Sequence, residues 1–182
     1  MRCACLEHNF SRFELIWIAK SPVLARNQGL TTPHLVFRKA RTMTREARLM
    51  SGIILITVPT IQYGGYFLLT SLMNKGSGYM ENPLRQNFFR AGHAHAGVIV
   101  ILSLVCQLLA DGAVLPTPVL WFVRIGVPLS AILISAGFFF SVLPPNATQA
   151  SGAVALIYAG ALILAVGVVT LGIGLLRSPL TS

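Results

Sequence analysis

Two histidines in an apolar stretch have the greatest chemical potential in this chain. His93 and His95 belong to the run Arg-Ala-Gly-His-Ala-His-Ala-Gly at residues 90–97. An ionisable side chain in hydrocarbon is costly and usually faces the interior of a helix bundle, so it counts as a functional candidate. The pair is therefore a candidate ligand set for haem or a transition metal, a candidate proton path, or a polar contact between helices.

The spacing of the histidines limits this chemistry. In a regular α-helix, residues i and i+2 point about 200° apart, so His93 and His95 cannot bind one ion together. They converge only if the helix begins after His95. A haem or metal site otherwise takes one histidine from each of two protomers or needs other ligands, and the remaining histidines of the chain are His8 and His34.

A polar stripe on the preceding apolar segment offers partners for the imidazoles. Tyr63, Tyr66 and Thr70 recur at helical spacing, and Gln62 lies beside them. A tyrosine hydroxyl in hydrocarbon needs a hydrogen-bond partner. We expect the stripe to face the interior of the bundle, where it would carry protons together with the histidines in the proton-path hypothesis.

Small residues mark candidate contacts between helices. Gly92 and Gly97 flank the histidines and allow close approach of another helix or a flat cofactor. A second set of small residues recurs at four-residue spacing near the C-terminus, a pattern that brings membrane helices into contact. Its members that we assign to packing are Ala155, Ala159, Ala161, Ala165 and Gly174. They fit either a seam inside the bundle or a homodimer contact.

Four apolar segments carry these residues. Hydrophobic residues make up 54% of the 182-residue chain and charged residues 10%, whereas ordinary soluble domains contain about 25% charged residues. A helix needs about 20 apolar residues to cross a hydrocarbon core of about 30 Å. Segments of sufficient length lie at residues 49–73, 91–110, 118–143 and 150–176. An ordinary soluble domain is therefore excluded.

Short connections between the segments determine the fold. Residues 111–116 and 144–149 only reverse the chain, so successive helices must be antiparallel neighbours. The loop at residues 74–90 contains turn signals, among them Asn82-Pro83, and no further domain. We predict an all-α fold, an integral membrane four-helix bundle with antiparallel up-down-up-down topology, in residues 43–182. We expect residues 1–42 to be a poorly structured basic segment or an extension ahead of a natural start at Met43.

Positive charge gathers before the first apolar segment. Nine of the 14 Lys and Arg residues lie in residues 1–48, and cytoplasmic flanks of membrane spans retain positive charge. We predict that both termini are cytoplasmic and that the basic flank contacts anionic lipid. No aromatic stacking platform accompanies the charge, so we expect no nucleic-acid partner. In the third segment, Arg124 is expected to extend its side chain to the lipid headgroups.

Several motifs occur in an order that resembles a family of small bacterial four-helix membrane proteins of unassigned function. They are Asn82-Pro83-Leu84-Arg85, the run at residues 90–97, Asp111, and residues 138–143. The resemblance covers about residues 48–177, and it implies a membrane location and the same four spans but no catalytic residue. The histidine-bearing segment is also similar, more distantly, to helices of haem-copper oxidases and nitric oxide reductases.

Enzyme signatures are absent from the sequence. No Asp or Glu lies within an apolar segment, and neither a nucleophile triad nor a phosphate-binding glycine loop is present. We therefore favour a non-enzymatic packing or accessory subunit of the bacterial cytoplasmic (inner) membrane, acting as a homo-oligomer or in a larger complex. Two alternatives remain open. One is haem or metal binding through His93 or His95, and the other is a small oligomeric permease or proton path.

Overall fold

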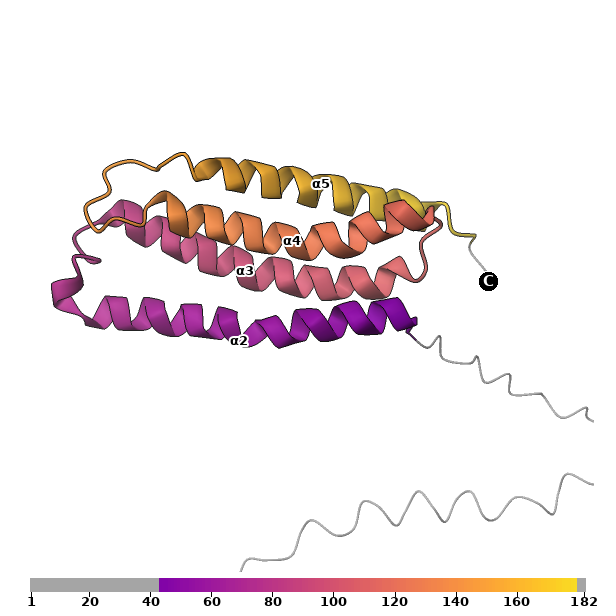
Figure 1. Ribbon diagram of the computed structural model, residues 1–182, viewed down its shortest axis with the longest axis horizontal. Helices are drawn as coiled ribbons and strands as arrows, with labels where there is room; N and C mark the ends of the chain where they lie inside the picture. Colours follow the sequence, from indigo (N-terminus) through magenta and orange to yellow (C-terminus); the bar gives the residue numbers. More distant parts are fainter. Residues whose placement is uncertain (1–42, 180–182) are drawn as a thin grey trace, which may run out of the picture. The chain divides into compact units, whose positions relative to one another are not determined.

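The computed structural model describes residues 43–179, so the segment at residues 1–42 lies outside the described range. Within that range the long helices are α2 (Arg45–Met73), α3 (Pro83–Ala110), α4 (Thr117–Ser141) and α5 (Val154–Leu176), and the short 3-10 helix η1 (Lys75–Ser77) follows α2. All four long helices have the length and hydropathy needed to cross a membrane. Successive helices pack side by side and antiparallel (Figure 1), which confirms the predicted four-helix membrane fold.

Helix α3 begins at Pro83, eight residues before the predicted position 91. The side chain of Asn82 caps it by accepting a hydrogen bond from the backbone N–H of Arg85 at 3.1 Å. Asn is among the best N-cap residues, and proline is favoured at the first helical position. The dipeptide that we expected to be a turn is therefore a helix start, and α3 extends eight residues beyond the N-terminal end of the predicted span.

The other spans differ from the prediction mainly at the connection between α4 and α5. Helix α4 ends at Ser141, two residues before the predicted end. Helix α5 begins at Val154 rather than at residue 150. The intervening chain turns back on itself, because the backbone N–H of Ser151 donates to the carbonyl of Ser141 at 2.8 Å. This turn shortens the last predicted span by four residues.

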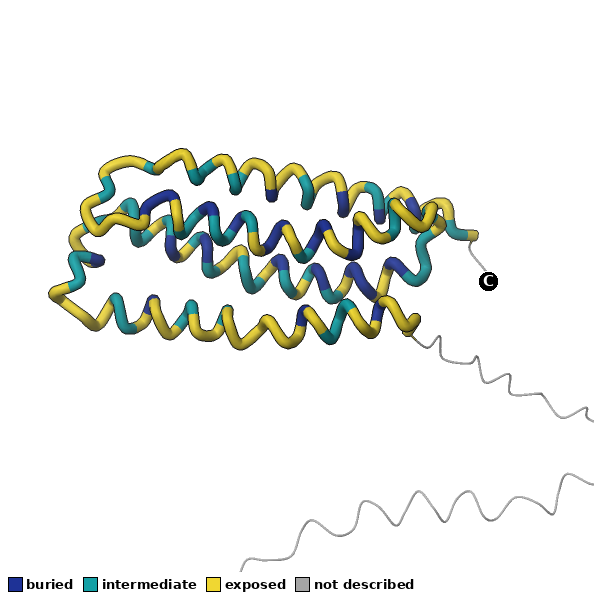
Figure 2. The backbone as a smooth tube through the Cα atoms, viewed as in Figure 1, coloured by how far each residue is buried: buried dark blue, intermediate teal, exposed yellow. Residues whose placement is uncertain are grey.

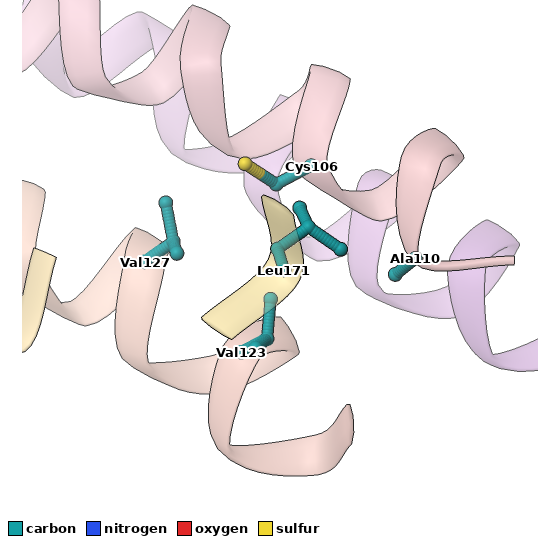
Figure 3. Close-up of a cluster of buried hydrophobic side chains, with 5 residues drawn as sticks. All are labelled: Cys106, Ala110, Val123, Val127 and Leu171. Carbon is teal, nitrogen blue, oxygen red and sulfur yellow. The ribbon is translucent and has the colours of Figure 1, made fainter. Parts of the chain in front are cut away.

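The hydrophobic core lies among α3, α4 and α5. Buried residues line the facing sides of these helices, whereas most of α2 is exposed (Figure 2). Helix α4 has nine buried residues among 25, and α2 has three among 29. One core cluster (Figure 3) consists of Cys106, Ala110, Val123, Val127 and Leu171. Three helices thus form a packed unit, to which α2 is added on one side.

Glycines hold α4 and α5 close together. The buried residues of α5 are Gly160, Gly167, Leu171 and Gly174. A Cβ atom on Gly160 would lie 2.7 Å from Cγ1 of Ile134, and a Cβ atom on Gly137 of α4 would lie 2.6 Å from Cγ1 of Ile157. Both distances are far below a van der Waals contact. Close approach of the two backbones therefore requires glycine at these positions.

The four-residue pattern of small residues on α5 does not coincide with this seam. The alanines at its positions are exposed, namely Ala155, Ala159, Ala161 and Ala165. These alanines therefore do not form a seam inside the bundle. That they form a homodimer contact remains a prediction. Gly174 does face the bundle, because a Cβ atom there would lie 2.6 Å from Cγ of Leu115. The buried glycines recur at seven-residue spacing, a repeat that the four-residue pattern missed.

Candidate functional site

The two histidines lie in the third and fourth turns of a continuous helix. Because α3 runs without interruption from Pro83 to Ala110, the exception that would let His93 and His95 converge is excluded. The ring of His95 packs on Phe138 of α4, with ring centroids 5.1 Å apart. Its Nδ1 lies 2.7 Å from the carbonyl oxygen of Ala91, and since a carbonyl oxygen only accepts, Nδ1 must carry the proton.

His93 faces a different neighbour, a pair of glycines on α2. Its Nδ1 lies 3.5 Å from the position that a Cβ atom would take on Gly64, and its Nε2 lies 3.3 Å from the corresponding position on Gly65. Among the described residues neither ring nitrogen of His93 has a hydrogen-bond partner, in contrast to His95. The imidazoles therefore serve different helices, His93 towards α2 and His95 towards α4.

The glycines beside the histidines differ in how closely other side chains pack against them. Gly92 is buried, and a Cβ atom there would lie 3.0 Å from Cβ of Phe138 and 3.1 Å from the ring of Phe139. Gly97 has open space at the corresponding position. Close packing on α4 therefore involves Gly92, while Gly97 leaves room beside α3.

Metal binding requires more ligands than the described residues bring together. Within residues 43–179 there is no group of three or more His, Cys, Asp or Glu side chains that could bind an ion. Zinc sites use three or four protein ligands. Cys106 is buried in the apolar core cluster and contributes no such group. A metal at either histidine would need ligands from outside this range or from a second protomer.

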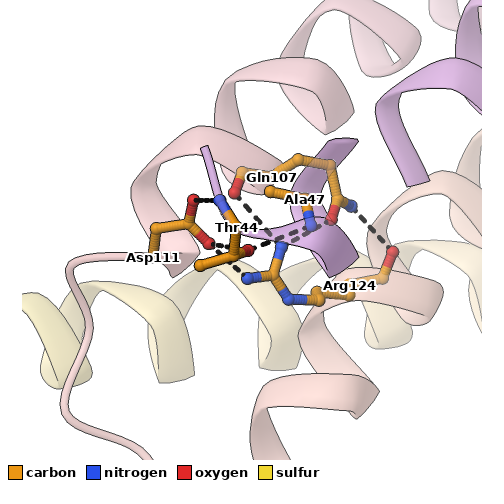
Figure 4. A network of polar contacts seen from close by, with 5 residues as sticks. All are labelled: Thr44, Ala47, Gln107, Asp111 and Arg124. Atoms are coloured by element: carbon orange, nitrogen blue, oxygen red, sulfur yellow. Dashed lines mark hydrogen bonds and ion pairs between the residues drawn. The ribbon is translucent and has the colours of Figure 1, made fainter. Parts of the chain in front are cut away.

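A polar cluster with a buried centre, the polar clamp, joins α2, α3 and α4. It consists of Thr44, Gln107, Asp111 and Arg124 (Figure 4). Nη2 of Arg124 forms an ion pair of 2.6 Å with Oδ1 of Asp111. Its Nη1 donates to the side-chain oxygen of Gln107 at 3.1 Å, and Nε2 of Gln107 donates to the carbonyl of Arg124 at 2.9 Å.

Burial of Arg124 contradicts the expectation that it extends to the headgroups. The residue is 3% exposed, and Gln107 is fully buried. A buried charge is tolerated when it is paired and its donors are hydrogen-bonded. Asp111 and Gln107 meet this requirement from the end of α3, so the guanidinium has no need to reach the lipid surface. The sequence signal that we missed is the acidic residue at the end of the preceding span, on the same side of the membrane as Arg124.

Thr44 connects the beginning of α2 to this cluster. Its backbone N–H donates to Oδ2 of Asp111 at 3.0 Å, and its hydroxyl donates to Oδ1 at 2.7 Å. The same hydroxyl accepts a hydrogen bond from the N–H of Ala47 at 3.2 Å and so caps α2. Both carboxylate oxygens of Asp111 therefore accept hydrogen bonds. The polar clamp is therefore a structural element and has no free acid or base.

The hydrogen bonds at Asp111 also determine its ionisation. Burial raises the pKa of this carboxyl group, but hydrogen bonds from the hydroxyl and backbone N–H of Thr44 and the contact with Arg124 favour the ionised form. Together these contacts outweigh burial and lower the pKa of Asp111 below its ordinary value. The carboxylate is thus held in its charged form, as the neighbouring guanidinium requires.

The polar stripe of α2 faces outwards in the single chain. Tyr63 is 70% and Tyr66 62% exposed, and Gln62 is exposed as well. Thr70 is half-buried, and its hydroxyl donates to the carbonyl of Phe67 at 2.9 Å. The expectation that this stripe faces the interior of the bundle is wrong. The glycine pair at residues 64–65, rather than the tyrosines, faces α3, where a Cβ atom on Gly65 would lie 3.2 Å from Cε1 of His93.

The Asn82-Pro83-Leu84-Arg85 motif closes the opposite end of the bundle from the polar clamp. Nδ2 of Asn82 donates to the carbonyl of Ala147 at 2.9 Å, in the loop between α4 and α5. Arg85 donates to the carbonyls of Val142 and Leu143 at the end of α4, each at 3.2 Å. Both carbonyls lie just beyond Ser141, the last residue of α4, where the helix dipole makes a cation favourable. The motif has a structural role.

Comparison with known proteins identifies no family. No protein-family model matches this chain, and no curated protein or solved structure matches it significantly. The four long apolar helices are consistent with the spans that the resemblance to small bacterial four-helix membrane proteins implies. Sequence and structure together identify a multi-pass membrane protein with four candidate spans in the described part of the chain.

Proposed function

We propose that this chain is a non-enzymatic subunit of the bacterial inner membrane that assembles with a second copy of itself through the outer face of α2. One observation carries the proposal, namely the exposed side chain of Gln62 near the middle of a membrane-spanning helix. Lipid tails offer an amide neither a donor nor an acceptor. A protein partner at this face supplies both.

The position of Gln62 makes its exposure costly. The middle residue of α2 (Arg45–Met73) is Pro59, and at 1.5 Å per residue Gln62 lies about 5 Å along the helix from it. The hydrocarbon core extends about 15 Å to each side of the bilayer centre. A primary amide in an apolar medium without hydrogen bonds costs about 2–7 kcal/mol. Pairing of α2 with another helix removes this cost.

The spacing on α2 indicates a second copy as that partner. Alternating steps of three and four residues form the heptad seam of a left-handed helix pair. The seam positions are Gly52, Leu55, Pro59, Gln62, Tyr66, Leu69 and Met73, all exposed except the half-buried Gly52. A glutamine amide both donates and accepts, so it is complementary to its own copy across a two-fold axis. One polar residue in such a seam fixes its register.

The exposed alanines of α5 form a competing seam. Ala155 and Ala159 lie four residues apart on a face that also includes Leu162, which is 66% exposed. Alanine and leucine side chains are compatible with lipid, and the hydroxyl of Tyr158 beside them lies in the second turn of α5, close enough to the membrane surface to reach the interface. Helix α2 therefore has the stronger requirement for a protein contact.

The other two hypotheses have less support among the described residues. His93 and His95 diverge on a continuous helix, so a haem or metal would need further ligands. A proton path would require polar groups that continue from the histidines. Tyr63 and Tyr66 instead lie on the exposed face of α2, away from His93.

The proposed orientation places both termini in the cytoplasm. The exposed cations at the end of the bundle where α2 begins are Arg45, Arg48 and Arg177. At the other end, Lys75 and Arg90 are exposed, whereas Arg85 is held at the end of α4. The first set, with the basic residues before position 43, would contact anionic lipid. A reporter fused after Ser182 that is active only in the cytoplasm should be active, and activity of an export-dependent reporter would contradict this orientation.

Single-molecule photobleaching of the fluorescently labelled protein in liposomes tests the assembly. We expect two-step bleaching that increases with the protein-to-lipid ratio. Gln62→Leu should weaken the dimer about three- to twentyfold, the range of one interhelical hydrogen bond in a membrane. Tyr158→Leu on α5 removes a side chain of comparable exposure, 72%, and should leave the dimer unchanged. A wild-type chain that is monomeric at all ratios would overturn the proposal.

A further inference from the structure

A cavity of about 560 Å³ lies among α2, α3 and α4. Small residues from all three helices contribute to its wall, namely Gly64, Ala96, Ala131 and Ala136. On α2 the cavity is lined by Thr57, Thr60 and Ile61, which belong to a different face from the heptad seam. The cavity therefore does not depend on the proposed dimer.

The mouth of the cavity opens towards lipid between α2 and α4. Its lining includes Ile53 of α2 and Ile125, Leu129 and Ile132 of α4, which are 41–63% exposed. Among the described residues that line the cavity, His93 is the one with an ionisable side chain, and none is Lys, Arg, Asp or Glu. An entering molecule must therefore be soluble in the bilayer and uncharged, which excludes phospholipid headgroups and fatty-acid carboxylates.

Two polar groups at this cavity have no partner within residues 43–179. His93 lines the cavity, and neither of its ring nitrogens has a hydrogen bond. The hydroxyl of Ser135, on the α4 side, is also without a partner. The hydroxyls of Thr57 and Thr60 differ, because both already donate to backbone carbonyls at 2.6 Å. The unused capacity of this site is thus an imidazole, which has one N–H donor and one acceptor nitrogen, and a serine hydroxyl, so each of the two residues can supply one donor.

We propose that this cavity binds an uncharged lipophilic molecule with two acceptor oxygens on an apolar frame, the chemistry of an isoprenoid quinone. His93 donates to one carbonyl oxygen, Ser135 lies where it can donate to the other, and Phe139 contributes an aromatic wall. The hydrocarbon tail leaves through the mouth between α2 and α4. A volume of about 560 Å³ is within the usual range of small-molecule sites, about 300–1,000 Å³.

Photolabelling of the full chain in lipid nanodiscs tests the site. The probe is a benzoquinone with a diazirine-bearing decyl tail, and the competitors are decyl-benzoquinone and decylbenzene. We expect labelled peptides from the cavity-lining parts of α2, α3 and α4. Decyl-benzoquinone should compete with the label, whereas decylbenzene, which has no acceptor oxygens, should not. Labelling spread over all four helices, or equal competition by both molecules, would overturn the proposal.

Variants test separately whether binding needs the hydrogen bond from His93 and whether it needs the volume of the cavity. His93→Leu should raise the concentration of decyl-benzoquinone needed for half-maximal competition about three- to tenfold, the effect of one hydrogen bond. His93→Gln retains a donor and should recover part of this loss, and Ala96→Phe, which fills the cavity, should abolish labelling. His95→Leu removes the histidine that faces away and should change nothing. Competition that is unchanged by His93→Leu and Ser135→Ala, in protein with wild-type thermal melting, would contradict the assigned donors.

Discussion

Helix α2 and the three-helix unit α3–α4–α5 are held together by different means. In the three-helix unit, glycines bring the backbones of α4 and α5 close, and α4 buries nine of its 25 residues. Helix α2 buries three of 29 and exposes a glutamine and two tyrosines within the membrane. Packing in membranes depends on close contact and on hydrogen bonds, because lipid tails are as apolar as leucine. The three-helix unit is held by close contact along its length. Helix α2 is held by the hydrogen bonds of Thr44 at its start and by the apolar packing of Phe67 and Leu68 in the cluster around Phe89 near its end.

This difference suggests a division of roles within one chain. The close-packed unit of α3, α4 and α5 forms the frame of the bundle. Helix α2 is attached to it by the polar clamp at Thr44 and by the contact between His93 and the glycine pair at residues 64–65. Its outer face is thus free to meet another protein, and the cavity of about 560 Å³ remains between α2 and α4.

Loss of the carboxylate at position 111 should have the largest effect, because it breaks the connection between the two regions. Asp111→Asn leaves the guanidinium of Arg124 buried without its counter-ion, a change that typically costs about 3–5 kcal/mol. The measurement is unfolding by a denaturing detergent in mixed micelles. Glu46→Gln, at an exposed residue, is the control and should have little effect. Asp111→Asn combined with Arg124→Met should recover much of the loss, and no recovery would contradict the role of the buried charge.

Two glycine substitutions compare the regions directly. Gly137→Ala places a Cβ atom 2.6 Å from Cγ1 of Ile157 and 2.8 Å from its backbone nitrogen, and overpacking of this kind costs about 1–3 kcal/mol. Gly52→Ala on α2 has nothing within 4 Å and should stabilise the helix by up to about 1 kcal/mol. Thermal melting in mild detergent measures both. Equal effects at the two positions would mean that α2 is packed at Gly52 as closely as α4 is packed on α5 at Gly137.

Removal of the cap on α2 should have a smaller and more local effect. Thr44→Val removes the hydroxyl that donates to Asp111 and accepts from Ala47, and loss of an N-cap typically costs about 1 kcal/mol. Hydrogen exchange should become faster in the first turns of α2 and remain unchanged in α4 and α5. Thr60→Val, whose hydroxyl bonds only within α2, is the matched control. Faster exchange throughout the bundle would contradict a local attachment.

Acid should weaken the polar clamp gradually. The pKa of Asp111 is lowered in the folded chain, so its carboxylate stabilises the fold fully above its unfolded-state pKa of about 3.9. This contribution is lost as the pH falls through the lower, folded-state pKa. Unfolding measured between pH 6 and pH 3 should therefore show a loss of stability at the acidic end that is absent in Asp111→Asn. Because only part of the titration falls in this range, the effect is the smallest of the four.

Much of the fold could be predicted from residue types alone, because four apolar stretches of spanning length, with Arg124 as their single Lys, Arg, Asp or Glu residue, leave few alternatives. The start of α3 could not be predicted in this way, because the dipeptide Asn82-Pro83 is typical both of a turn and of a helix N-cap. The polar clamp was missed for a related reason. The length of an arginine side chain predicts that Arg124 extends to the headgroups. Only the packing of α3 on α4 shows that Asp111 and Gln107 bind its guanidinium inside the bundle.

The faces of the helices were the least predictable feature. Polar residues in a span suggest an interior face, yet Gln62, Tyr63 and Tyr66 are exposed because the glycine pair beside them gives closer packing on α3. The alanines of α5 have the spacing of a packing motif, but the glycines at seven-residue spacing face the bundle instead, Gly160 and Gly167 towards α4 and Gly174 towards Leu115 before it. A choice between two faces of one helix depends on the neighbouring helix, and the sequence of a single span contains no such information.

Disulfide cross-linking of single cysteines in native membranes tests the central claim, that α2 is the assembly helix, most directly. In a chain whose natural cysteines are replaced, Leu55→Cys, Tyr66→Cys and Leu69→Cys should form cross-linked dimers. Ile101→Cys on α3, at a residue 65% exposed, and Leu162→Cys on α5, at a residue 66% exposed, should not. Cross-linking confined to the three heptad positions is the predicted result. Equal cross-linking at position 162, or none along α2, would contradict the account.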